Sequence, residues 1–196
     1  MKGVLNLEDQ LSFYMAYHSN KVNILIHSIC VPLITFSSFF LLANFKSPLP
    51  VFQSSLDAYA NLGVLSSAGL AILYILLDPY VGTAVAPIVI GSSMLFTDIL
   101  ENDSYIAKAN SVAGVIFVIS WIAQFIGHGV FEHRAPALLD NLVQALILAP
   151  FFVTYEAVFV LGFRKDLQKR LEVKVADKIK KFKEAKQAKT PVKEKK

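Results

Sequence analysis

The residues best suited to chemistry in this sequence are its four histidines, which fall into two clusters far apart in the chain. His18 and His27 lie in the segment YHSNKVNILIHS, and His128 and His133 lie in GHGVFEH, with Glu132 between them. Imidazole and carboxylate groups together bind divalent transition metals, and three such ligands that leave open positions are typical of non-haem Fe(II) oxygenases. Zinc accepts the same ligands. Composition and spacing alone leave open a second interpretation, in which the histidines only form hydrogen bonds at a membrane interface and bind no metal.

The spacing inside each cluster sets conditions for a shared site. His128 and Glu132 are four positions apart, so they share one face if the chain is helical there. This spacing suits two ligands of one metal, or one ligand and the residue that orients it. His18 and His27 would point in opposite directions on one unbroken helix. We expect them to converge only if a helix begins near Asn20, which is a suitable N-cap residue, with His18 on the preceding segment.

Long stretches without Asp, Glu, Lys or Arg predict the helices that must position these side chains. Hydrophobic residues make up 55% of the 196 residues and charged residues only 17%, whereas soluble domains are about a quarter charged. A helix needs about 20 apolar residues to cross a bilayer, and continuous runs without alternation disfavour barrel strands. The uncharged stretches are Val22–Phe45, Ala58–Leu77, Pro79–Thr97, Ala109–Phe131 and Asn141–Tyr155. The sequence therefore predicts an all-α fold, a polytopic bundle of transmembrane helices, rather than a soluble bundle with polar stripes.

The order of these helices allows the two histidine clusters to meet. Four crossings separate the start of the first helix from the end of the fourth, and an even number returns the chain to the same membrane face. We expect the fourth helix to end at Gly127-His128-Gly129, because glycine is poor in a helix interior and common at a helix end. The segment around Pro150 is either re-entrant or a plain fifth span, and the sequence leaves both open.

A basic tail follows the hydrophobic part of the chain. From Arg164 onward the sequence has 14 Lys or Arg and 5 Asp or Glu, whereas the chain before it has 5 and 10. We divide the chain into a membrane-embedded bundle at residues 1–163 and a basic cytoplasmic tail at residues 164–196, helical and then disordered. Apolar residues recur every three to four positions, which predicts an amphipathic helix over Arg164–Lys186 that either contacts anionic lipid or is solvated. We expect no binding to nucleic acid, and the single cysteine, Cys30, excludes a disulfide framework.

Two patches of the sequence resemble a known family. FYMAYHSNKVNILIHSICVPL at Phe13–Leu33 and WIAQFIGHGVFEHRAPALLDNLVQALILAPFF at Trp121–Phe152 are similar to the fungal endoplasmic-reticulum dioxygenases that act on 2-hydroxy fatty acids in phytosphingosine degradation. The resemblance covers most of the first 163 residues and is weak through Ser47–Asn110 and in the tail. It implies an Fe(II)-dependent α-oxidation, in which a 2-hydroxy fatty acid and dioxygen give a fatty acid one carbon shorter and carbon dioxide. It also implies a multi-pass protein of the endoplasmic-reticulum membrane in which residues 1–163 are catalytic, and the positive-inside rule places the basic C-terminus in the cytoplasm.

The resemblance further implies roles for particular residues. His18, His27 and His128 become the first candidates for iron ligands, and Glu132 is the next candidate and a possible catalytic carboxylate. The family commonly has a basic residue just before its Pro-Ala-Leu segment. In this chain Arg134 stands one position away from that place, and it is our candidate to hold the substrate carboxylate, with Lys21 as the alternative.

The chemistry implied by the resemblance fits the predicted layout. A 2-hydroxy carboxylate can chelate a metal through its hydroxyl and one carboxylate oxygen, beside bound dioxygen. A helix bundle in a membrane supplies an apolar slot for the acyl chain, so we expect 2-hydroxy fatty acid, dioxygen and membrane lipid as partners. The sequence leaves the oligomeric state open. The alternative is a membrane-shaping or scaffolding protein built on the hairpin at Ala58–Thr97 and the basic tail. Scaffolding does not need clustered histidines, and a transporter would usually place ionisable residues in mid-span.

Overall fold

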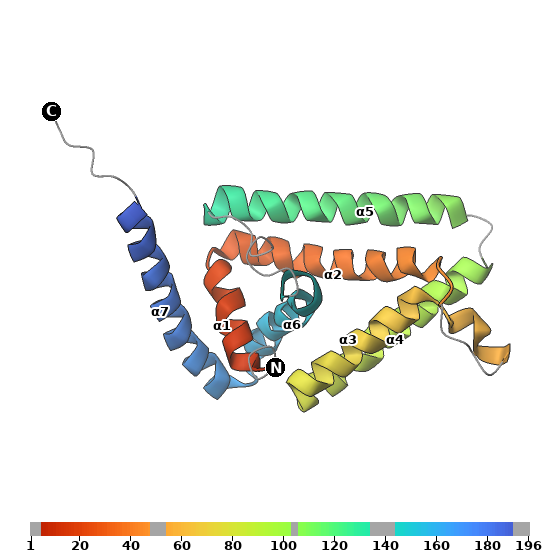
Figure 1. Ribbon diagram of the computed structural model, residues 1–196, viewed down its shortest axis with the longest axis horizontal. Helices are drawn as coiled ribbons and strands as arrows, with labels where there is room; N and C mark the ends of the chain where they lie inside the picture. Colours follow the sequence, from red (N-terminus) through yellow and green to blue (C-terminus); the bar gives the residue numbers. More distant parts are fainter. Residues whose placement is uncertain (1–4, 48–53, 103–105, 134–143, 190–196) are drawn as a thin grey trace.

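The computed structural model describes residues 5–47, 54–102, 106–133 and 144–189, and throughout these ranges the chain is built from helices (Figure 1). The α-helices in these ranges are α1 (Leu7–Tyr17), α2 (Lys21–Ala43), α3 (Leu62–Leu77), α4 (Pro79–Asn102), α5 (Ile106–Ile126), α6 (Ala149–Val160) and α7 (Lys165–Lys189). The same ranges contain short helical segments, namely the 3-10 helix η1 (Ser54–Tyr59) and the π-helices η2 (Gly127–Glu132) and η4 (Gln144–Leu148). The predicted all-α class is confirmed.

The break between α1 and α2 is the feature on which the histidine prediction depends. The side chain of Asn20 accepts a hydrogen bond from the backbone N–H of Val22 at 2.9 Å, so Asn20 is the N-cap of α2 as the sequence predicts. His18 lies at the C-cap of α1. From there α2 continues through Pro32 to Ala43 without interruption.

The packing of α5 against α2 brings the two histidine clusters of the sequence together. The two helices lie side by side and run in opposite directions (Figure 1), so the end of α5 lies beside the start of α2. The α-helical part of the fourth predicted helix ends at Ile126, as expected. The chain does not leave the helix axis at Gly127, however, because η2 continues as a π-helix to Glu132.

The segment between α2 and α5 forms the predicted helical hairpin, α3 and α4, which turns at Asp78 and Pro79. Its first helix is shorter than the predicted stretch Ala58–Leu77, since η1 extends to Tyr59 and the side chain of Asn61 caps α3 by accepting from the N–H of Val64 at 3.0 Å. The resulting helix has 16 residues, fewer than the roughly 20 that cross a bilayer without tilt or thinning.

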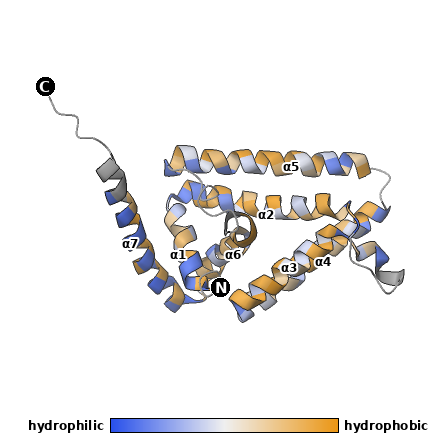
Figure 2. Cartoon of the chain, viewed as in Figure 1, coloured by the Kyte–Doolittle hydropathy of each residue, from blue (hydrophilic) through white to orange (hydrophobic). Residues whose placement is uncertain are grey.

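Three helices in the described part of the chain are long and apolar enough to cross a membrane, at Lys21–Ala43, Pro79–Glu101 and Ile106–Glu132. The segments Leu146–Val160 and Lys165–Phe182 form a pair of helices bent by 116°. This pair is either a broken span, which would be the fourth, or a re-entrant loop. Hydrophobic residues predominate along α2 to α5, whereas hydrophilic residues predominate along α7 (Figure 2). These helices indicate that the protein associates with a membrane.

The basic helix α7 packs against α1. Leu167 and Leu171 of α7 are buried, and Glu8 of α1 forms ion pairs with Arg170 at 3.0 Å and Lys174 at 2.8 Å. The predicted amphipathic helix is therefore present at Lys165–Lys189, but its apolar face covers protein.

A buried carboxylate fastens the hairpin turn to the junction of α6 and α7. Asp78 caps α4 by accepting hydrogen bonds from the backbone N–H groups of Tyr80 and Val81 at 2.9 and 3.2 Å. It also accepts one from the Tyr155 hydroxyl at 2.6 Å and forms an ion pair with Arg164. Burial tends to raise the pKa of Asp78, but these hydrogen bonds and the Arg164 charge outweigh it and hold the pKa below its usual value.

Candidate metal centre

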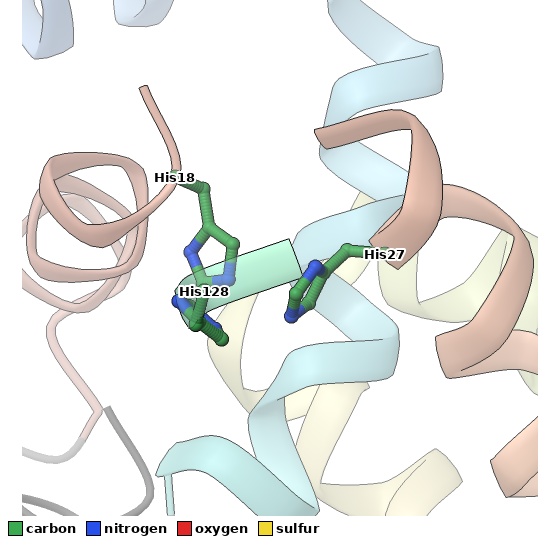
Figure 3. Close-up of side chains that lie close together, drawn as sticks. All are labelled: His18, His27 and His128. Atoms are coloured by element: carbon green, nitrogen blue, oxygen red, sulfur yellow. The ribbon is translucent and has the colours of Figure 1, made fainter. Parts of the chain in front are cut away.

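Three of the four histidines meet in one buried cluster, formed by His18, His27 and His128 (Figure 3). His18 follows α1, His27 lies in the second turn of α2, and His128 lies in η2. Their exposed fractions are 6%, 4% and 4%. One ring nitrogen from each lies within 4.8 Å of the other two. Two imidazole nitrogens bound to one ion at about 2.1 Å can be no more than about 4.2 Å apart, so the cluster is close to the size that one ion requires.

Backbone carbonyl groups orient two of the three rings. Nδ1 of His18 lies 2.7 Å from the carbonyl oxygen of Tyr14, and Nδ1 of His27 lies 3.0 Å from that of Asn23. A carbonyl can only accept, so each Nδ1 donates its proton and each Nε2 keeps its lone pair. Histidine ligands of metals commonly have this arrangement, because the second hydrogen bond fixes the tautomer and the direction of the ring.

The surroundings of His18 favour the neutral imidazole that binds a metal. Burial lowers the pKa of His18 well below its ordinary value, and the nearby rings of His27 and His128 lower it further. Its Nε2 is buried and has no hydrogen-bond partner among the described residues. A buried polar atom without a partner costs about 1–3 kcal/mol, and a metal ion would remove this cost. The ring set therefore fits a divalent transition metal.

A glycine allows η2 to approach α2 closely enough to complete the cluster. A Cβ atom on Gly127 would lie 2.3 Å from Oδ1 of Asn23, a side chain that is fully buried. The neighbouring Gly129 has no heavy atom within 4 Å of the corresponding position. The Gly-His-Gly sequence thus uses its first glycine for close packing beside His128.

Glu132 lies beside the cluster, but its carboxylate contacts the start of α2. Oε1 accepts hydrogen bonds from the backbone N–H groups of Ser19 and Asn20 at 2.6 and 2.7 Å and from Nδ2 of Asn23 at 3.3 Å. Oε2 accepts one from the Ser19 hydroxyl at 3.0 Å. A negative charge at this position also complements the positive end of the α2 dipole. The structure therefore groups three imidazoles without Glu132, and a ligand role for Glu132 stays a prediction.

Two further residues of the sequence motif do not join the cluster. His133 is exposed and has a left-handed backbone conformation with φ of 50° at the end of η2. Arg134, the candidate to hold the substrate carboxylate, lies outside the described residues.

Tyr14 and Asn23 each precede a histidine by four positions, and this spacing predicts that they lie beside the cluster. The ring of Tyr14 stacks on His18 with centroids 4.1 Å apart. The sequence did not identify the backbone carbonyl groups of Tyr14 and Asn23 as the groups that orient the rings, nor Gln124, which is 8% exposed.

The fold and the cluster together define a class: an all-α, membrane-associated protein with three buried imidazoles able to hold a metal. Within this class, comparisons with known proteins identify one family. Residues 4–161 match the family model described as 2-hydroxy-palmitic acid dioxygenase Mpo1-like. The chain is 43% identical over 171 residues to 2-hydroxy-palmitic acid dioxygenase MPO1 of Saccharomyces cerevisiae, and the match covers 87% of this chain and 90% of the yeast protein. No solved structure matches the chain.

This protein therefore belongs to the Mpo1-like 2-hydroxy-palmitic acid dioxygenase family. The resemblance found in the histidine segments is confirmed, and the family favours an enzyme over a scaffolding protein. Dioxygenase family membership also agrees with a metal cofactor, for which the three histidines form a candidate site.

Proposed function

We propose that this protein is an Fe(II)-dependent dioxygenase that shortens 2-hydroxy fatty acids, such as 2-hydroxypalmitic acid, by one carbon with loss of carbon dioxide. The observation that carries the proposal is the buried cluster of His18, His27 and His128 in a member of the 2-hydroxy-palmitic acid dioxygenase family. One dioxygen molecule balances the reaction, since a 2-hydroxy acid and O₂ give the shorter acid, carbon dioxide and water without another reductant.

Iron suits this reaction better than zinc. Zinc would accept three imidazoles, but it has no redox chemistry. Ferrous iron held by three protein ligands keeps open positions for other molecules. When bound, iron would supply the activation of dioxygen and two positions for the hydroxyl and carboxylate oxygens of the substrate.

The protein's own groups would hold and shield this centre. Nε2 of His18 and of His27 would bind the metal, while the carbonyl groups of Tyr14 and Asn23 keep the opposite nitrogens protonated. Burial of the rings excludes water from the centre. For Glu132 we propose a positioning role, because its contacts hold the start of α2 against η2. Arg134 remains our candidate to bind the substrate carboxylate.

We also propose that the protein resides in the endoplasmic-reticulum membrane with its basic tail in the cytoplasm. Support comes from α7, which packs on α1, the helix that directly precedes His18. This packing favours the re-entrant interpretation of the segment around Pro150, with the tail on the same membrane face as the histidines. Clustered lysines near a membrane favour the cytoplasmic side. The proposed division at residues 163 and 164 then separates the catalytic bundle from a helix docked on it.

The test uses purified full-length protein, its iron content and its products. We expect close to one iron per chain and conversion of 2-hydroxypalmitic acid to pentadecanoic acid only when dioxygen is present. His128→Ala should lose both iron and turnover, whereas His133→Ala, a change at an exposed histidine, should retain both. Chelation should abolish turnover and ferrous iron should restore it. Full activity after exhaustive chelation, or normal turnover in His128→Ala, would contradict the proposal.

A further inference from the structure

We infer that the acyl chain of the substrate lies in an apolar groove between α2, α3, α5 and the start of α6, entered past Gln124. This inference rests on the proposed function, because it places the substrate head group at the histidine cluster. It adds the position of the chain, the residue at the entrance and the part of the groove that determines chain length.

The groove has a volume of about 590 Å³, within the range of about 300–1,000 Å³ typical of small-molecule sites. Ile34 and Leu42 of α2, Leu70 and Leu73 of α3, and Phe117 and Trp121 of α5 line it. The hydroxyl groups of Thr35 and Ser38, which also line it, donate hydrogen bonds to backbone carbonyl groups of α2. The wall is therefore mainly apolar and suits a hydrocarbon chain.

A small space, here called the neck, adjoins this groove on the side nearer to His27 and His128. The neck is a space of about 20 Å³ that shares Ile34, Thr35 and Trp121 with the groove and is also lined by Val31 and Gln124. Val31 follows His27 by four positions on α2, and Gln124 precedes His128 by four positions. Each is therefore about one helical turn from a histidine, so a chain that leaves the cluster through the neck enters the groove.

Gln124 gives the neck its only amide among the residues that line it. Its side chain is buried, and its Nε2 has no hydrogen-bond partner in the described part of the chain. An unpaired amide N–H group is costly in an apolar setting. The carboxylate or hydroxyl oxygen of a 2-hydroxy acid at the cluster would accept this hydrogen bond, which makes Gln124 a candidate to position the substrate head group.

A second groove is less suited to the same chain. It has about 680 Å³ and lies between α2, α4 and α5, with Lys108 at one end and Ile116 as its α5 residue nearest in sequence to the cluster. Lys108 precedes His128 by 20 positions, about 30 Å along a helix, and none of its lining residues is within one turn of a histidine. Continuity with the cluster therefore selects the groove that contains Trp121.

Gly69 provides a way to shorten the groove. It lines the groove but not the neck, and a Cβ atom there would have no heavy atom within 4 Å. The variant Gly69→Phe should therefore fill the groove without disturbing the helix contacts. Gly91 of α4 has the same open surroundings and lines none of the three cavities, so Gly91→Phe is the matched control.

Turnover provides the first measurement. Gly69→Phe should lower kcat/KM for 2-hydroxypalmitic acid, relative to that for the shorter 2-hydroxyoctanoic acid, by about tenfold or more. This is the usual cost of forcing atoms into filled space. Gly91→Phe should leave the ratio unchanged. Gln124→Leu should raise KM for both acids by about tenfold, the loss of one hydrogen bond to a charged group, without changing their ratio. An unchanged ratio in an iron-loaded Gly69→Phe protein would overturn the groove assignment.

Fluorescence provides a second measurement that does not need turnover. Trp121 is the single tryptophan of the chain and lines both groove and neck, so a bromine atom on the acyl chain should quench its emission. Without dioxygen, 2-hydroxypalmitic acid brominated in mid-chain should quench Trp121 in the native protein and in Gly91→Phe, but less in Gly69→Phe. Equal quenching by brominated phospholipid would show a groove for bilayer lipid and overturn the assignment. Quenching by the acid without any turnover would retain the groove and reject the proposed function.

Discussion

Substitution of Glu132 separates two roles that the sequence alone could not distinguish. If the carboxylate is a metal ligand, removal of its charge should remove iron. If the carboxylate holds the start of α2 in place, the loss in the free energy of unfolding should instead follow the number of hydrogen bonds broken. Oε1 accepts three of these bonds and Oε2 accepts one, all from Ser19, Asn20 or Asn23.

Glu132→Ala removes all four hydrogen bonds. Bonds to a charged group contribute about 1.5–3 kcal/mol each when well shielded, but Ser19 is exposed and water will replace part of its contacts. We therefore expect a loss of about 2–4 kcal/mol in the free energy of unfolding. Because α2 carries His27 and η2 carries His128, we also expect iron affinity to fall by about 10–100-fold, as for other groups that support metal ligands.

Glu132→Gln is the variant that decides between the two roles. An amide oxygen in the place of Oε1 keeps the three hydrogen bonds made there, and the amide nitrogen can donate to the Ser19 hydroxyl. We expect a loss of about 1 kcal/mol for the missing charge at the helix N-terminus, with close to one iron retained per chain. The assays are thermal unfolding followed by circular dichroism and iron content of the purified protein, with His128→Ala as the iron-free reference. If Glu132→Gln lost iron as completely as His128→Ala while unfolding at the native temperature, the positioning argument would be wrong and the carboxylate would be a ligand.

Three further predictions test the packing around the site. Gly127→Ala should lower stability by about 1–3 kcal/mol through overpacking and reduce the iron content, whereas Gly129→Ala should do neither; equal effects in thermal unfolding would contradict the role of the close approach. Asp78→Asn should lower stability near neutral pH by about 1–3 kcal/mol. The pKa of Asp78 is lowered in the folded state, so its contribution to the free energy of unfolding is fully present above its unfolded-state pKa of about 3.9. This contribution is lost as the pH falls through the folded-state pKa. Acid unfolding of the variant should therefore depend less on pH between these two pKa values. Lys174→Glu should weaken docking of α7 on the acidic turn of α1, because it replaces an attraction to Glu8 and Asp9 with a repulsion. We expect faster tryptic cleavage of α7 at low salt, with Lys180→Glu as an exposed control; a rate independent of salt would refute an electrostatic contribution.

Much of the fold could be predicted because it depends on local patterns. Uncharged stretches marked α2, α4 and α5, the N-cap at Asn20 marked the start of α2, and Asp78-Pro79 marked the hairpin turn. Helix order and an even number of predicted crossings allowed His18 and His27 to meet His128, and the structure places the three rings together. Their binding of iron stays a prediction.

The parts that could not be predicted depend on contacts between segments far apart in the sequence. Glu132 is four positions from His128, so its spacing suggested a ligand, but its hydrogen bonds are made to residues more than a hundred positions away. After Ile126 the chain continues as a π-helical turn, and there Gly127 packs closely against Asn23 of a distant helix. Similarly, α7 shows an amphipathic pattern, and the pattern alone does not distinguish a lipid surface from the surface of α1 as its partner.

The position of the histidines at helix ends follows from the requirements of a polar site beside a membrane. A helix end leaves backbone carbonyl and N–H groups without intrahelical partners, and such groups are costly near lipid. The last turn of α1 and the first turn of α2 meet at His18–Asn20, where the ring of His18 donates to the carbonyl of Tyr14 and Glu132 accepts from the N–H groups of Ser19 and Asn20. The groups that need partners at the helix break are therefore the groups that orient the candidate ligands. A continuous helix through this segment would satisfy its backbone but would turn His18 away from His27, so the break between α1 and α2 is what makes the cluster possible.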